Sequence, residues 1–235
     1  LVMPDLVQDI AVLLSYTMQD INGVKPLKCP IPEVKKDDLT IKNTMYKAPG
    51  LRKMHLELAE LKGMKILHCV FFPDPNYNLP IFGCDIVATE KVITAAIVDI
   101  SPVRGFDNWD DVREISNEFN IGEKRPLPLW GDEIFSPYCK FMRLTEDIDM
   151  ANFYCLVLNY LGIYCKLHSK ATRDPDWCAA MLRYDDQIYY CDQQRKNDKT
   201  RGILEKWFDK EWTNDYIDKV LFDKPSSDDI KYGTD

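Results

Sequence analysis

The sequence predicts an α/β protein, a three-layer α/β/α sandwich built around a central antiparallel sheet. Three stretches carry this prediction: apolar residues recur at helical spacing near the start, at strand-like spacing from about residue 39 to 100, and mainly at helical spacing afterwards. A block of strands with helices before and after it in the sequence favours a layered sandwich. At 235 residues the chain fits one domain, residues 1–235, because domains commonly reach about 250 residues.

The first half is expected to contain one helix and then strands. Residues 5–21 place apolar side chains at helical spacing, and Gly23 is a typical helix stop. A proline-rich connection follows. Strands are then expected at residues 39–41, 43–46, 55–58, 65–72, 79–88 and 92–100. Turn signals such as Pro49-Gly50 separate several of them. Connections this short join antiparallel neighbours, since parallel pairs need a crossover of about a dozen residues.

The second half is predicted to be mainly helical. Residues 109–119 form a short amphipathic segment, and residues 135–144 are expected to add one more strand. Residues 147–164 indicate a longer helix, and the stretch from 187 to 222 is expected to form one or two helices. These helices would cover the sheet.

The composition excludes several classes of function. The net charge of −8 argues against nucleic acid as a partner, because binding phosphates needs a basic surface. No apolar run approaches the roughly 20 residues that span a bilayer, so we expect a soluble protein without membrane contact. We also expect a monomer. None of the eight cysteines forms a C-x-x-C pair, so no metal site is expected.

A basic segment interrupts this acidic chain. Five basic residues fall between Arg195 and Lys206, against two acidic ones, Asp198 and Glu205. Such a local excess indicates an anionic ligand or an acidic protein partner. The alternative is a solvated helix face.

Ionisable side chains occur in strands that are otherwise apolar. Side chains two apart on a strand share a face, so His55 and Glu57 point the same way. His68 shares its face with apolar residues, and Asp85 shares its face with Gly83, which leaves room for a flat ligand. An unpaired carboxylate in such a strand carries a large desolvation cost. An aspartate and a histidine that meet over the sheet would titrate as a pair, as proton donors do.

Ordinary structural explanations exist for each of these residues. A single histidine on an apolar strand is commonly a hydrogen-bonded core residue. Asp85 could cap a turn or pair with an arginine, and Asp99 is a second candidate of the same type. The number of such residues on consecutive strands favours an acid–base pocket over the sheet. The residues alone define no substrate.

Four motifs resemble the ferredoxin-dependent bilin reductases, especially the branch that makes phycocyanobilin. They are residues 52–59 (RKMHLELA), 66–70 with 72–73 (ILHCV, FP), 79–87 (LPIFGCDIV) and 196–201 (KNDKTR). Weaker matches occur at 99–102, 127–131 and 220–223. The resemblance runs in order from about residue 45 to 223. It implies an α/β/α sandwich that reduces biliverdin IXα by a radical mechanism, without metal or flavin, using electrons from a separate 2Fe-2S ferredoxin.

The resemblance also implies roles for individual residues. Asp85 and His68 would protonate the bilin near a terminal lactam, and Glu57 and His55 would supply or relay further protons. The substrate-binding residues would be Arg125 and Lys199, which match propionate-binding residues, together with Thr94, Asn197 and Thr200. The residues expected to dock ferredoxin are Arg195, Lys196 and Arg201.

The product is predicted less directly. A composition rich in Lys, Asp, Asn and Ile is similar to that of phage-type family members that yield phycoerythrobilin, which we slightly favour. Glu57 is associated with the step toward phycocyanobilin, which is the alternative.

We expect the protein to act in the cytoplasm of a cyanobacterial or phage-infected cell. A non-catalytic bilin chaperone and, if the resemblance misleads, a cofactor-independent isomerase are competing functions.

Overall fold

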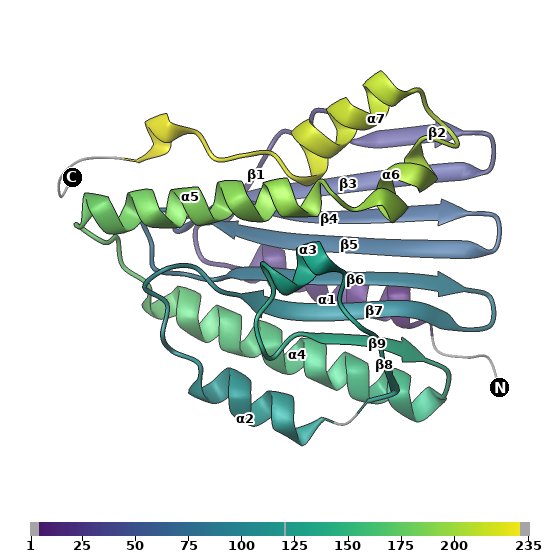
Figure 1. Cartoon of the computed structure of the whole chain (residues 1–235), viewed down its shortest axis with the longest axis horizontal. Coiled ribbons are helices and arrows are strands. Elements are labelled where there is room, and N and C mark those ends of the chain that lie inside the picture. The colour runs from purple at the N-terminus through teal and green to yellow at the C-terminus, as the bar shows by residue number, and fades with distance from the viewer. Residues whose placement is uncertain (1–4, 120, 231–235) are drawn as a thin grey trace.

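The computed structural model describes residues 5–119 and 121–230, and it confirms the predicted sandwich (Figure 1). In these residues nine strands form one antiparallel sheet in the order β1-β3-β4-β5-β6-β7-β9-β8, with β2 also paired to β3. The strands are β1 (Lys25–Pro26), β2 (Glu33–Lys36), β3 (Leu39–Ala48), β4 (Leu51–Leu61), β5 (Met64–Pro73), β6 (Ile81–Thr89), β7 (Ile93–Ser101), β8 (Glu123–Lys124) and β9 (Lys140–Leu144).

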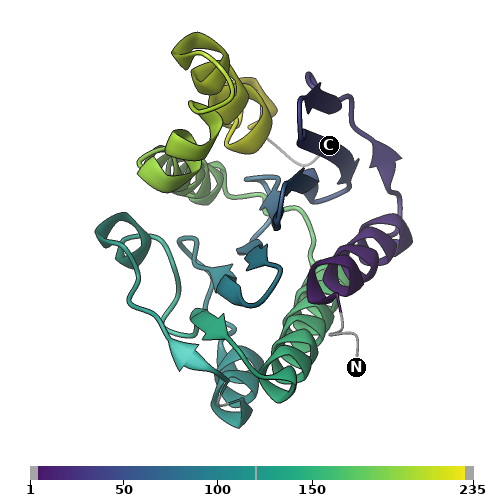
Figure 2. The ribbon, with the colours of Figure 1, turned by 90° about the vertical axis from the view of Figure 1, so that its right-hand side faces the viewer.

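The helices lie on both faces of this sheet, as the edge-on view shows (Figure 2). They are α1 (Leu6–Asp20), α2 (Asp110–Glu118), α3 (Leu129–Asp132), α4 (Asp147–Lys170), α5 (Trp177–Gln194), α6 (Asp198–Leu204) and α7 (Lys210–Tyr216), followed by a π-helical turn (Ile217–Leu221) and a 3₁₀ turn (Ser227–Asp229). The prediction that the whole chain is a single domain stays a prediction.

One sheet face packs against α1 and α4. The Asp5 side chain caps α1 by accepting from the backbone N–H of Gln8. Ile10, Leu14 and Met18, spaced four residues apart along α1, are all fully buried, as expected for the core-facing stripe of a helix. Cys69 and Cys84 lie in this apolar layer as small buried residues.

The opposite face packs against α5, α6 and α7, and it is the face that carries the polar strand residues. Val70 and Phe72 on β5 contact a cluster that includes Tyr190 on α5 and Val220 in the π-helical turn. The acid–base residues therefore lie in an interior layer between sheet and helices.

Some element boundaries differ from the prediction, for local reasons. The strands predicted at 39–41 and 43–46 are one strand, β3, because exposed Lys42 only continues the in–out alternation. The proline-rich connection contains β1 and β2, and Pro26 is tolerated because β1 is an edge strand. Helix α5 begins ten residues before Gln187, where the Asp176 side chain accepts from the backbone N–H groups of Cys178 and Ala179.

Strand β9 begins at Lys140 rather than at residue 135. Ser136 and Pro137 precede it, and the Ser136 N–H donates to the Asp99 side chain instead of to a neighbouring strand. Among residues 5–119 and 121–230, every helix is too short or too polar to cross a lipid bilayer.

Candidate active site

Three of the predicted acid–base residues lie side by side across the middle of the sheet. Glu57 on β4 is directly opposite His68 on β5, and His68 is directly opposite Asp85 on β6. Opposed residues on one face have Cβ atoms about 5 Å apart. His55 stands two residues before Glu57, on the same face. The structure therefore brings together the four residues that the sequence singled out.

His68 and Asp85 form a hydrogen-bonded pair. The Nδ1 atom of His68 lies 2.6 Å from Oδ1 of Asp85. The two side chains are 12% and 39% exposed, so the carboxylate reaches solvent while the imidazole is nearly covered. Burial acts to lower the pKa of His68, but the charge and hydrogen bond of Asp85 outweigh it and hold that pKa above its ordinary value. The pair can therefore store a proton beside a partly open carboxylate.

His55 is wholly buried and has a different electrostatic character. Burial, together with the nearby charge of Lys53, holds the pKa of His55 well below its ordinary value, so its ring is neutral. Its Nε2 atom lies 2.8 Å from Oδ1 of Asn43. The His55 and His68 rings meet edge to face with centroids 5.6 Å apart. Two histidines in one layer thus differ in their tendency to hold a proton.

Glu57 is the third ionisable group of the layer. It is 7% exposed and accepts a hydrogen bond from the hydroxyl of Tyr216 on α7. Burial raises the pKa of Glu57, although His68 and the Tyr216 hydrogen bond oppose the shift. A carboxyl group of this kind holds its proton more readily than an exposed one, which suits a general acid.

The end of the C-terminal helical layer lies directly over His68. The Phe222 ring contacts the His68 ring edge to face at 5.4 Å between centroids. Its backbone is held by Arg195, which donates to the Phe222 carbonyl at 2.8 Å. Next to it, Asp223 accepts from both Arg52 and buried Lys53. These contacts fix the wall that faces the histidine.

Gly83 lies two residues before Asp85 on β6, on the same face of the sheet, and leaves that position without a side chain. A Cβ atom at Gly83 would come within 3.5 Å of the Tyr190 hydroxyl on α5. Tyr190 in turn accepts a hydrogen bond from Gln194 at 3.0 Å. This is an ordinary van der Waals distance, so the Tyr190 hydroxyl covers Gly83 without requiring a glycine there.

Asp99, the second aspartate singled out in the strands, serves a structural contact. Asp99 is on β7, lies opposite Gly83 on β6 and is 1% exposed. Ser101 donates to it at 2.6 Å, and the Ser136 N–H donates to it at 3.0 Å. Burial raises the pKa of Asp99 to about 6, against these hydrogen bonds. The carboxylate ties the loop before β9 to the sheet.

The expected propionate-binding arginine lies at the far end of the same row. Asp85 pairs with Ile97 on β7, and Ile97 pairs with Phe141 on β9. The Arg125 guanidinium covers the Phe141 ring at 5.1 Å and donates to the Thr94 carbonyl. The cation therefore lies over β9 and reaches β7, the strand that neighbours Asp85's strand β6.

The remaining expected substrate-binding residues lie at the start of α6. Asn197 caps this helix by accepting from the backbone N–H groups of Lys199 and Thr200, at 3.2 and 3.4 Å. The Lys199 side chain is exposed. The KNDKTR motif thus forms a turn and a helix N-terminus above the sheet.

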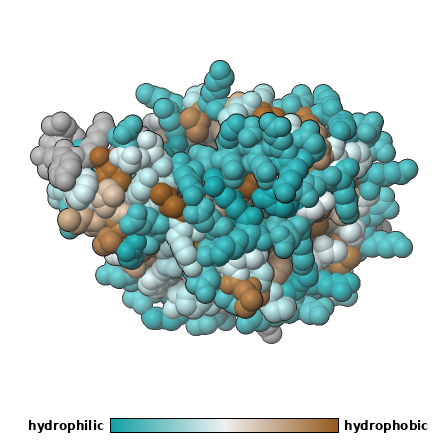
Figure 3. All heavy atoms as spheres, turned by 45° about the horizontal axis from the view of Figure 1, so that its top comes forward, coloured by the Kyte–Doolittle hydropathy of each residue, from teal (hydrophilic) through white to brown (hydrophobic). Residues whose placement is uncertain are grey.

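The three residues expected to dock ferredoxin differ in the contacts that their side chains make with the rest of the protein. Arg195 donates a hydrogen bond to the Phe222 carbonyl and forms an ion pair with Asp218 at 3.1 Å. Arg201 donates to Asn214 at 2.5 Å, and exposed Lys196 donates to Gln193 at 2.9 Å. The molecular surface above α5–α7 is mostly hydrophilic, with apolar residues only in small separate patches (Figure 3).

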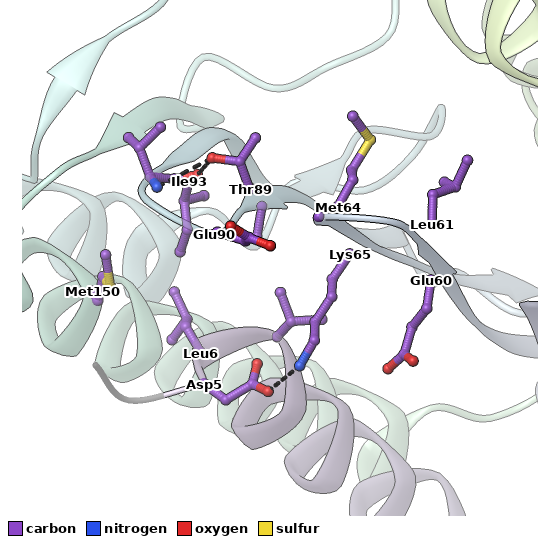
Figure 4. A pocket seen from close by; sticks show the side chains of 14 residues that line it. Asp5, Leu6, Glu60, Leu61, Met64, Lys65, Thr89, Glu90, Ile93 and Met150 are labelled. Atoms are coloured by element: carbon purple, nitrogen blue, oxygen red, sulfur yellow. Dashed lines mark hydrogen bonds and ion pairs between the residues drawn. The ribbon is translucent and has the colours of Figure 1, made fainter. Parts of the chain in front are cut away.

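A separate cavity of about 430 Å³ lies at the ends of the β4–β5 and β6–β7 hairpins (Figure 4). The start of α1 closes it, where Asp5 pairs with Lys65. Lys65 stands on the opposite sheet face from His68. None of the predicted site residues lines this cavity. Across residues 5–119 and 121–230, no cluster of three or more His, Cys, Asp or Glu side chains could hold a metal ion.

Two residues of the site, Asn43 and Tyr216, were not among the residues predicted from the sequence. The signal for Asn43 was present: Leu39, Ile41, Asn43 and Met45 alternate as the buried face of β3, so a polar residue occupies an interior position. Tyr216 carries no comparable signal, because its contact with Glu57 joins residues 159 positions apart.

The fold agrees with what comparison with known proteins shows. The model of the ferredoxin-dependent bilin reductase family matches residues 18–223. The chain belongs to this family and is a ferredoxin-dependent bilin oxidoreductase.

Individual relatives are named more narrowly. The chain is 43% identical to phycocyanobilin:ferredoxin oxidoreductase of Prochlorococcus marinus (strain MIT 9515) over 79% of this chain and 78% of the relative. It is 40% identical to the enzyme of that name from Synechococcus sp. (strain CC9902) over 94% and 93%.

Two solved structures have the same fold. Tomato phytochromobilin synthase, solved in complex with biliverdin, is 18% identical with a TM-score of 0.78, over 90% of this chain and 82% of that one. A PcyX protein is 16% identical with a TM-score of 0.54, over 92% and 99%.

Proposed function

We propose that this chain reduces biliverdin IXα to a phycobilin by four electrons and four protons. Reduced ferredoxin supplies the electrons singly, so bilin radicals are intermediates, and the protein supplies the protons. The observation that carries the proposal is the row Glu57–His68–Asp85 on three adjacent strands, in an otherwise apolar layer. The biliverdin complex of tomato phytochromobilin synthase supports the choice of substrate.

The two ends of the row suit the two ends of the substrate. Asp85 is the partly open carboxyl that gives the first proton, and His68 restores it through their 2.6 Å contact. Glu57, with its raised pKa, donates to the second reduction site, and His55 relays protons behind it. Arg125 and Lys199 bind the propionates, since guanidinium and ammonium groups form charge-assisted hydrogen bonds with carboxylates.

The neighbours of these cations complete the substrate site. The Thr94 carbonyl accepts from the Arg125 guanidinium, and the Asn197 side chain accepts from the backbone N–H groups of Lys199 and Thr200, which fixes the turn that carries Lys199. Ferredoxin approaches the basic segment that contains Arg195, Lys196 and Arg201. An acidic electron carrier and a basic surface form the small, charge-steered contact typical of electron transfer.

The product that we propose is phycocyanobilin. Relatives about 40% identical carry that product in their names, and Glu57, which the resemblance associates with this product, is held by Tyr216 beside the His68–Asp85 pair. Phycoerythrobilin, favoured by the composition of the chain, is the second candidate.

Product analysis tests this proposal. The protein is incubated anaerobically with biliverdin IXα, ferredoxin and an electron source, and the extracted pigment is compared with both authentic phycobilins by chromatography. Phycocyanobilin is the expected product. Phycoerythrobilin would overturn the product assignment while leaving the reductase assignment intact, and unchanged biliverdin would overturn both.

A further inference from the structure

Asn43 is the centre of a buried hydrogen-bond network whose donor and acceptor directions can be assigned. Its Nδ2 atom lies 2.9 Å from the Ile31 carbonyl oxygen and 2.9 Å from the Tyr216 hydroxyl. Its Oδ1 atom lies 2.8 Å from Nε2 of His55. A backbone carbonyl only accepts, so the amide nitrogen must face Ile31. The amide oxygen therefore faces His55.

This orientation fixes the tautomer of His55. An amide oxygen only accepts hydrogen bonds, so Nε2 of His55 must carry the hydrogen. The ring is neutral, and its Nδ1 atom is therefore a bare acceptor. Within the part of the chain that the structure describes, this Nδ1 atom is buried without a hydrogen-bond partner.

Tyr216 settles the second proton position. Its hydroxyl accepts from Nδ2 of Asn43 and donates to Oε2 of Glu57. A longer contact of 3.2 Å from the hydroxyl to Oδ1 of Asn43 competes for the same single hydrogen, and the shorter contact with Glu57 takes it. Because Oε2 then acts as an acceptor, a proton on Glu57 resides on the other oxygen, Oε1.

The tyrosine ring is itself held rigidly. Tyr216 is fully buried and stacks on Trp212 with centroids 4.9 Å apart and planes 9° apart. Trp212 stacks in turn on Phe208 at 3.8 Å. Burial beside Glu57 raises the pKa of Tyr216, so the hydroxyl keeps its hydrogen. The donor aimed at Glu57 is therefore permanent.

We propose that Asn43 and Tyr216 are positioning residues that set the proton positions of the reductase: Asn43 fixes His55 as the Nε2–H tautomer, and Tyr216 restricts the Glu57 proton to Oε1. The catalytic meaning of this network rests on the proposed function. The proton positions themselves are properties of the free protein.

The test of the tautomer needs no substrate. Nitrogen-15 NMR of the ligand-free protein, with labelled histidine side chains, distinguishes the two neutral tautomers. His55→Gln assigns the signal by its disappearance. The expected spectrum shows protonated Nε2 and bare Nδ1 for His55 throughout the stable pH range. A signal with the hydrogen on Nδ1, or an average of the two tautomers, would overturn the role of Asn43, whatever the activity of the enzyme.

The role of Tyr216 is tested with Tyr216→Phe, which keeps the ring stack and removes the hydroxyl. Removing a donor to the carboxylate raises the pKa of Glu57, so the alkaline limb of kcat against pH should move up by about one unit. At the pH optimum kcat should fall about tenfold, with KM for biliverdin changed less than about twofold.

Tyr164→Phe is the matched control. Tyr164 is also fully buried, its hydroxyl has no hydrogen-bond partner among the described residues, and it packs on the other sheet face. It should leave both the pH profile and kcat unchanged. An unshifted alkaline limb in Tyr216→Phe would overturn the positioning role of that hydroxyl. Absence of biliverdin turnover in the wild type would instead refute the proposed function.

Discussion

His68 on β5 and Asp85 on β6 face each other across one rung of the sheet, with Nδ1 and Oδ1 2.6 Å apart. The contact is short because both residues occupy opposed positions on the same face, where strand geometry already brings the side chains together. Asp85 remains 39% exposed while His68 is nearly covered. The arrangement suits a carboxyl that meets a ligand and an imidazole that supplies it with protons from behind.

Asp85→Asn should bind biliverdin but stop after the first electron, because an amide keeps the shape of the side chain and cannot deliver its proton. Electron paramagnetic resonance under anaerobic conditions with reduced ferredoxin should show an organic radical that accumulates. Turnover at the wild-type rate would rule out Asp85 as the first donor.

The His68–Asp85 pair should make stability depend on pH in a defined direction. The folded-state pKa of His68 is raised, so the stabilisation is fully present below the unfolded value of about 6.5 and is lost as pH rises through the folded value. The melting-temperature difference between wild type and His68→Gln should therefore be largest below about pH 6.5 and shrink above it. A difference that grows with pH would contradict the assignment.

Asp99 should have the opposite stability signature to an ordinary paired carboxylate. Its pKa is raised from 3.8 to about 6, so the folded state binds more protons than the unfolded state between these values. Stability from this group falls as pH rises through that window, by about 3 kcal/mol at 1.36 kcal/mol per unit. Urea titrations at pH 4 and 7 should show this loss in wild type and not in Asp99→Asn. If the free energy of unfolding falls equally between pH 4 and pH 7 in both proteins, the raised pKa of Asp99 is refuted.

Lys196→Gln combined with Arg201→Gln should raise the KM for ferredoxin roughly tenfold, because exposed charges mainly steer encounter. Biliverdin binding should stay within about twofold of wild type. Arg195 is left unchanged because it holds the Phe222 carbonyl. Lys166→Gln on α4, exposed on the far side of the sheet and paired with Asp111, is the control. If both proteins respond alike to ferredoxin and to added salt, docking occurs elsewhere.

Much of the sheet could be predicted from the sequence, because alternation fixes which residues of a strand share a face. That rule places His55 with Glu57 on one face of β4, and the polar positions of β5 and β6 indicate that His68 and Asp85 join them in one acid–base layer. Alternation does not determine that Glu57 and Asp85 both lie opposite His68, since strand register depends on where each hairpin turns. Turn signals such as Pro49-Gly50 limit the register without determining it.

The helical layer was harder to predict. Asn43 and Tyr216 are 173 positions apart, and no local pattern indicates that α7 returns to β3. Lys53 shows the same difficulty: its charge indicates a surface residue, yet it is 2% exposed and is bonded to the Val220 carbonyl at 2.6 Å. Long-range packing of this kind overrides local preference.

The most direct test of the central claim is the absorption spectrum of protein-bound biliverdin under anaerobic conditions, recorded with and without reduced ferredoxin. The long-wavelength band should persist without ferredoxin and bleach when reduced ferredoxin is added, as a reduced bilin forms with protons from the Glu57–His68–Asp85 row. A band that persists in both samples, with biliverdin bound, would contradict the account and would leave a bilin-binding protein without reductase activity.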